Sequence, residues 1–97
     1  MSEKKKIGPS GYFDVSTEHD IKQATKSVEK ELRSILLKYP MPYNTSHEFY
    51  GVLREEVDEL WDEIKTDKKQ GSKQRQIDEA IQVAAVALKF IMQNVAK

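Results

Sequence analysis

The sequence contains no cysteine. Disulfide bonds, zinc–thiolate sites and thiol nucleophiles are therefore excluded. It also has no net charge, because 16 lysine and arginine residues balance 16 aspartate and glutamate residues. A chain without net charge gives no electrostatic reason to bind nucleic acid or an anionic membrane surface. We therefore expect neither kind of partner.

Long apolar runs are also missing. The most apolar region, residues 83–92, is interrupted by Lys89 and is shorter than the roughly 20 residues that are needed to span a bilayer. The three lysines at positions 4–6 are not followed by the apolar segment of a secretory signal peptide. We therefore expect a cytoplasmic protein that does not enter the membrane.

What the sequence does contain is helical periodicity. With 97 residues the chain has the size of one small domain. Residues 1–16 show no periodicity and are predicted to be a flexible N-terminal arm, whereas residues 17–97 are predicted to form an all-α domain. Three main helices are expected. The first covers about residues 19–38, the second runs from a cap near residue 45 to about residue 65, and the third covers about residues 73–94.

Capping and turn residues set the expected ends of these helices. Thr17 is the predicted N-cap of the first helix, and two nearby prolines end it. Thr45 and Glu48 have the spacing of a capping box at the start of the second helix, with Ser46 as an alternative cap. Gly51 lies inside this helix, where it costs up to about 1 kcal/mol relative to alanine. We predict that it permits close approach of another helix, with a ligand as the alternative.

The third predicted helix differs from the other two because it is apolar on nearly all sides between Ile77 and Met92. Such a helix is buried on all sides, and two helices of one chain cannot enclose it. We therefore predict a homo-oligomer, a dimer or a tetramer, in which helices of several chains complete a bundle. In the second helix, Phe49 and Trp61 fall at helical spacing and are expected in the core, with base stacking as the alternative.

The second predicted helix is strongly acidic. Between His47 and Ile64 the chain carries seven acidic residues and a single base, Arg54. Glu56 and Glu59 are three residues apart, so their carboxylates are neighbours, which costs about 0.2–0.5 kcal/mol in an isolated helix. An acidic face is usually solvated surface, and the alternative is that it holds a cation.

Glu79 and Gln82 supply the second half of this pattern. They lie one turn apart inside the apolar third helix, where a carboxylate without a partner is costly. Lys89 is almost three turns away from Glu79, so the acidic face of the second helix is the closer partner. Two acidic groups can share a site only with a cation between them, and all-oxygen ligands favour a hard ion such as Mg²⁺ or Mn²⁺.

These residues carry a resemblance to a known family. The run Glu55-Glu56-Val57-Asp58-Glu59, a spacer of about twenty residues and then Asp78-Glu79-Ala80-Ile81-Gln82 before an apolar helix resembles the MazG-like all-α nucleoside triphosphate pyrophosphohydrolases. Their pattern is EExxE followed by ExxD. The resemblance covers roughly residues 47–94, half of the chain. It implies hydrolysis of an NTP or dNTP to the monophosphate and pyrophosphate, with Mg²⁺ or Mn²⁺ as cofactor.

The resemblance also implies roles for individual residues. The metal ligands would be Glu56, Glu59 and Glu79, with Gln82 in the fourth place. Glu55 or Glu59 would be the catalytic group that orients the attacking water. Gln82 departs from the pattern, because the family has an aspartate there. The glutamine amide oxygen can bind a hard cation, but it brings no charge and cannot act as a base.

Three lysines are candidates for binding the substrate phosphates: Lys68, Lys69 and Lys89. Capping of the second helix explains the first two equally well. Two alternatives to an active enzyme stay open. One is a catalytically weak or inactive MazG-like bundle that binds nucleotides or proteins. The other is a helical adaptor whose acidic face meets a basic partner.

Overall fold

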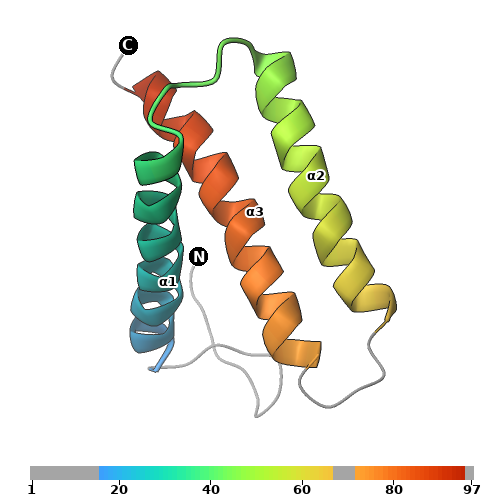
Figure 1. Cartoon of the computed structure of the whole chain (residues 1–97). Helices are drawn as coiled ribbons and strands as arrows, with labels where there is room; N and C mark the ends of the chain where they lie inside the picture. The colour runs from blue at the N-terminus through green and yellow to red at the C-terminus, as the bar shows by residue number, and fades with distance from the viewer. Residues whose placement is uncertain (1–15, 67–71, 96–97) are drawn as a thin grey trace, which may run out of the picture.

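The computed structural model describes residues 16–66 and 72–95 of the chain (Figure 1). Helix α1 is Thr17–Lys38, α2 is Ser46–Lys65 and α3 is Ser72–Val95. The predicted all-α fold with three main helices is thus confirmed. Among the described residues, no helix is both long enough and apolar enough to cross a membrane. Residues 1–15 of the predicted arm, together with Lys68 and Lys69, lie outside the described residues.

The three helices form one layer, with α3 in the middle (Figure 1). α3 contacts α1 on one side and α2 on the other, whereas α1 and α2 do not contact each other within the described ranges. α2 runs antiparallel to α3, and α1 runs in the same direction as α3 (Figure 1). The link between α1 and α2, residues 39–45, is hydrogen-bonded to the C-terminal half of α3.

The start of α2 follows directly from the sequence. Thr45 is its N-cap, as predicted, because the Thr45 hydroxyl oxygen accepts a hydrogen bond from the Glu48 amide at 3.0 Å. The Glu48 carboxylate in turn accepts a hydrogen bond from the Asn44 amide at 2.5 Å. This pair of bonds joins the end of the link to the first turn of α2 and satisfies two backbone donors.

The ends of α1 agree less closely with the ends predicted from the sequence. Its N-cap is Ser16, so the prediction of Thr17 as the cap is wrong by one residue. The predicted end at Lys38 is confirmed. Tyr39 precedes a proline, a position that disfavours helical backbone. The chain accordingly leaves the helix at Tyr39, which has a φ of −133° and a ψ of 73°.

The core of the described chain is small. Its buried apolar residues are Leu32 of α1 and Ala85 and Val86 of α3. At the contact between α2 and α3, the Phe49 and Phe90 rings stack with centroids 4.0 Å apart and an interplanar angle of 7°. Because α1 and α2 each contact only α3 in the described ranges, the core is limited to these two helix contacts.

Large apolar side chains remain exposed on α2 and α3. On α2, Val57 is 42% exposed, Trp61 54% and Ile64 43%. The prediction that Trp61 lies in the core is therefore wrong within one chain, because a helix with one neighbour buries only one side of a broad apolar arc. α3 is likewise not buried on all sides, since Ile77 and Ile91 are 45% and 53% exposed.

Gly51 of α2 faces open space. A Cβ atom placed on it would meet no heavy atom within 4 Å. The prediction that Gly51 permits close approach of another helix is therefore wrong within the described chain. The physical reason is that α2 contacts only α3 among the described helices, and Gly51 lies on a side of α2 that no described helix covers.

Candidate metal centre and adjoining groove

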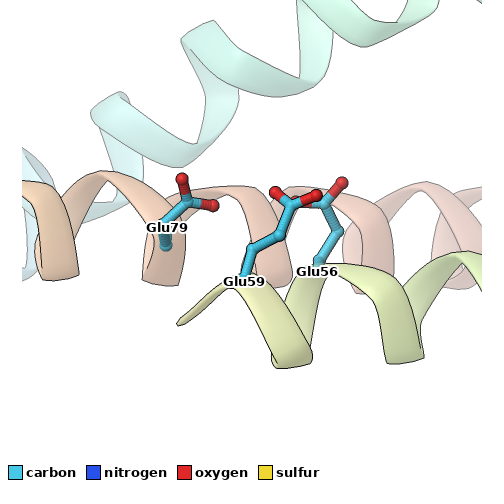
Figure 2. A group of neighbouring side chains, drawn as sticks. All are labelled: Glu56, Glu59 and Glu79. Atoms are coloured by element: carbon cyan, nitrogen blue, oxygen red, sulfur yellow. The ribbon is translucent and has the colours of Figure 1, made fainter. Parts of the chain in front are cut away.

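Three carboxylates from two helices meet at the contact between α2 and α3. Glu56 and Glu59 lie three residues apart on α2, so both point to one side of the helix, and Glu79 comes from α3. One oxygen of each carboxylate lies within 4.8 Å of the others. Figure 2 shows the three side chains reaching toward the same side of the two helices. This carboxylate cluster contains three of the four residues predicted as metal ligands.

Three other acids of α2 have basic partners: Asp58 lies 4.0 Å from Arg54, Asp62 lies 3.2 Å from Lys65, and Glu63 lies 3.0 Å from Arg75. Within residues 16–66 and 72–95, no lysine or arginine forms an ion pair with Glu56, Glu59 or Glu79. In the same ranges, Oε1 of Glu79 is buried and has no hydrogen-bond partner. A buried polar atom without a partner costs about 1–3 kcal/mol, so the cluster is best satisfied by a proton or a cation.

Burial and mutual repulsion disfavour ionisation of the cluster. Burial is the main cause that raises the pKa of Glu79, followed by the charge of Glu59. Burial also raises the pKa of Glu56, followed by the charges of Glu59, Glu79, Glu55 and Glu31. Both causes act in the same direction, since each favours the neutral form of a carboxyl group. A bound divalent cation would oppose both.

The cluster fits a hard divalent cation. Its donors are carboxylate oxygens, which Mg²⁺ and Mn²⁺ prefer. Oxygens on opposite sides of a Mg²⁺ ion are about 4 Å apart, because each lies about 2 Å from the metal. The separations in the cluster are at most 4.8 Å, so small side-chain movements would bring the oxygens to such an ion. Gln82, the predicted fourth ligand, is half-buried one turn further along α3.

A groove of about 860 Å³ adjoins the cluster. It is lined by residues of α1, the link, α2 and α3. Its end nearest the cluster contains Glu55, Glu56 and Gln82, and its other end contains residues of the link and Lys89. Seven residues of helix separate Gln82 from Lys89, which corresponds to about 10 Å along the axis. The groove therefore joins a carboxylate end to an end that has lysine and tyrosine side chains.

The two remaining predicted site residues within the described ranges lie at opposite ends of this groove. Glu55 is exposed on α2 and lines the groove next to Glu56. Lys89 is buried, and its ammonium group donates a hydrogen bond to the Tyr39 carbonyl oxygen at 2.9 Å. Lys89 Nζ also lies 4.6 Å from the centroid of the Tyr43 ring. The structure thus engages Lys89 with the link rather than with the cluster.

Sequence reasoning misses two residues of this site. Glu31 of α1 lines the groove, and its charge contributes to the raised pKa of Glu56. The signal that could have identified it is its place one turn from apolar residues of α1, which puts it beside the buried face. Tyr43 of the link also lines the groove, and burial raises its pKa, followed by the charges of Glu48 and Glu56. No periodic pattern marks a residue in a link.

Comparison of the chain with protein-family models, with curated proteins and with solved structures finds no match. The interpretation of the site therefore depends on its geometry and on the resemblance of its two motifs. Both single out Glu56, Glu59 and Glu79, which come from two separate helices and are adjacent in space.

Proposed function

We propose that the protein is a metal-dependent nucleoside triphosphate pyrophosphohydrolase with a MazG-like helical bundle. The observation that carries the proposal is the meeting of Glu56, Glu59 and Glu79 within 4.8 Å, without a basic partner in the described ranges. Carboxylate sites of this kind suit Mg²⁺ or Mn²⁺. The adjoining groove of about 860 Å³ falls within the range of about 300–1,000 Å³ that is typical of small-ligand pockets.

The proposed reaction hydrolyses the bond between the α- and β-phosphates of an NTP or dNTP. Water attacks the α-phosphorus, the bridging oxygen leaves with pyrophosphate, and the nucleoside monophosphate is the second product. Bound Mg²⁺ or Mn²⁺ would neutralise phosphate charge and lower the pKa of the attacking water. Glu56, Glu59 and Glu79 would hold the cation, while Glu55 or Glu59 would orient the water and accept its proton. Gln82 supplies an uncharged amide oxygen at the same end.

The groove gives this substrate a direction. The triphosphate would be placed at the end with Glu56 and Gln82, because these residues line the groove beside the carboxylate cluster. The nucleoside would extend toward the link, where Tyr43 and Asn44 line the groove. Lys89 is about 10 Å along α3 from Gln82 by helical rise, and its ammonium group donates to the Tyr39 carbonyl oxygen of the link. Its role belongs to the link end.

We also propose that the chain assembles into a homo-oligomer. Val57, Trp61 and Ile64 of α2 are exposed and spaced by four and three residues, so they form one stripe along the helix. Contiguous exposed apolar surface of this kind is typical of protein interfaces. A second copy of the chain would cover the stripe and supply the neighbour that α2 lacks within the described residues.

The enzyme proposal is tested by pyrophosphate release from the eight common NTPs and dNTPs, with Mg²⁺ and then with Mn²⁺. The wild type should release pyrophosphate. Glu56→Gln and Glu79→Gln should abolish release, because each removes a charged ligand. Asp62→Asn is the matched control, since Asp62 is an acid of the same helix that pairs with Lys65 outside the cluster. Release by the two cluster variants at the wild-type rate would refute the proposal.

One residue favours a second candidate, a nucleotide-binding or protein-interaction module that has lost catalysis. Gln82 stands where the resembling family has an aspartate, so the site has one negative charge fewer. Release of pyrophosphate only by a Gln82→Asp variant would support this candidate. If neither the wild type nor the Gln82→Asp variant releases pyrophosphate but both bind Mn²⁺, this candidate is also supported. If neither releases pyrophosphate and neither binds Mn²⁺, a helical adaptor is favoured.

A further inference from the structure

Two side chains of α3 form hydrogen bonds with the backbone of the link. Gln93 bonds the Tyr43 backbone twice: its Oε1 accepts from the Tyr43 amide at 2.8 Å, and its Nε2 donates to the Tyr43 carbonyl oxygen at 3.1 Å. One turn earlier, Lys89 Nζ donates to the Tyr39 carbonyl oxygen at 2.9 Å. Residues four apart lie on one face of a helix, so one face of α3 bonds the link at two points.

Lys89 is bound in an unusual way for a lysine. It is 6% exposed, although lysine is almost never buried without a charged partner. No carboxylate forms an ion pair with it in the described part of the chain. Its ammonium group faces the Tyr39 carbonyl oxygen and the Tyr43 ring instead. Because a buried charge without compensation is costly, these contacts with the link are what make its burial tolerable.

The link has little means of fixing its own position. Pro40 and Pro42 lack the amide hydrogen that a backbone hydrogen bond needs. Tyr43 is therefore held from outside, through Gln93 and through its side chain. Its ring lies 5.4 Å from that of Phe49, and its hydroxyl donates to the Val86 carbonyl oxygen at 3.5 Å.

We propose that Lys89 and Gln93 are positioning residues that hold the link as one wall of the groove and thereby set the affinity for the nucleoside part of the substrate. The link residues Tyr39 and Tyr43 line the groove together with Lys89. The first half of the proposal stands on the hydrogen bonds, and the second half rests on the proposed function. Lys89 and Gln93 lie about 10 Å and about 16 Å along α3 from Gln82, so they act without contact to the cluster.

Amide hydrogen exchange, followed by NMR, tests whether these residues hold the link. Gln93→Met removes the acceptor of the Tyr43 amide, whose exchange should accelerate about tenfold, the factor expected for the loss of one hydrogen bond. Lys89→Met should accelerate the same amide, because it frees the other end of the link. Amides in the middle of α3 should exchange as in the wild type, which separates release of the link from global unfolding. Lys30→Met and Gln23→Met, at exposed positions of α1, are the controls.

Methionine is apolar and of similar length, so Lys89→Met removes a buried charge that has no carboxylate partner in the described residues and whose burial is costly. In steady-state kinetics with the best substrate of the panel, both variants should raise KM more than they lower kcat, and Mn²⁺ binding should match the wild type. Unchanged Tyr43 exchange, unchanged KM or a loss of Mn²⁺ affinity would each overturn the proposal. If the wild type shows no turnover, the proposed function fails, while Tyr43 exchange still decides whether Lys89 and Gln93 hold the link.

Discussion

The Glu79→Gln substitution distinguishes a cation site from an ordinary acidic surface. Glu79 has a buried oxygen without a partner in the described residues, and its carboxylate lies within 4.8 Å of those of Glu56 and Glu59. Glutamine keeps the length and shape of the side chain, removes its charge and brings an amide group that can donate to a neighbouring carboxylate. We therefore expect the substitution to stabilise the metal-free protein and, if the cluster is the proposed cation site, to abolish cation binding.

The size of the gain follows from the geometry. At a separation of 4.8 Å, two unit charges repel by about 0.9 kcal/mol in water and by about 3.5 kcal/mol at an effective dielectric constant of 20. Glu59 is exposed, and salt screens exposed charges, so the lower figure applies to its pair with Glu79. Removing the repulsion of Glu79 with Glu56 and with Glu59 should raise the free energy of unfolding by about 1–3 kcal/mol. Each kcal/mol corresponds to about 4–8 °C in Tm for a domain of this size.

The pH dependence has a definite sign. The pKa values of Glu79 and Glu56 are raised in the folded protein, so between the ordinary and the raised values the folded state binds more protons than the unfolded chain. The contribution of these two carboxyl groups to the stability of the metal-free wild type should therefore be most favourable below the ordinary pKa of 4.5 and should be lost as pH rises through the raised values. Glu79→Gln should make this fall smaller. With Mg²⁺ or Mn²⁺ present, stabilisation should instead grow with pH, because cations bind ionised carboxylates.

Thermal unfolding followed by circular dichroism, in EDTA and in Mg²⁺ or Mn²⁺, measures these effects across the acid to neutral range. A ligand at 100 times its Kd stabilises the folded state by about 2.7 kcal/mol. The wild type and the control Asp62→Asn should show this stabilisation by the metal, and Glu79→Gln should not. A lower Tm for Glu79→Gln in EDTA at neutral pH would refute the repulsion argument. An equal metal-induced shift in wild type and variant would show that Glu79 is not a ligand.

Three further predictions concern other parts of the molecule. Gly51→Ala should raise the free energy of unfolding in urea by up to about 1 kcal/mol, because Gly51 has open space around it; a loss of stability would show that another chain packs there. Trp61→Glu should lower the mass found by equilibrium sedimentation, and a compact wild-type monomer at micromolar concentration would disprove the oligomer. Gln82→Asp should tighten Mn²⁺ binding in calorimetry by about tenfold, since ligand charge tunes cation affinity; equal affinity would place Gln82 outside the ligand set.

The helices could be predicted because their signals are local. Apolar periodicity predicted the third helix at about residues 73–94, and α3 is Ser72–Val95. The Thr45 cap follows from the side-chain chemistry of one turn. The three carboxylates of the cluster were also within reach of the sequence. A spacing of three residues puts Glu56 and Glu59 side by side on a helix, and an acid inside an apolar helix needs a partner.

Which helices touch could not be predicted from periodicity. An apolar arc shows that one side of a helix is to be covered but not what covers it. Because α3 lies between α1 and α2, Trp61 and Gly51 meet open space instead of a neighbouring helix. The groove has the same origin, since it is lined by two helices that do not touch in the described ranges. Glu31 and Lys89 acquire their places only through this tertiary arrangement.

At the contact between α2 and α3, one acid of α2 has a basic partner and the acid one turn away has none in the described ranges. Glu63 follows Glu59 by one turn on α2, and Arg75 of α3 neutralises it at 3.0 Å. One turn after Arg75, at the position where a second base would neutralise Glu59, α3 carries the acid Glu79. An acidic surface that served solubility alone would keep its oxygens in water, whereas Oε1 of Glu79 is buried. Burial combined with charge that no described base neutralises is the arrangement expected of acids that retain a proton or bind a cation.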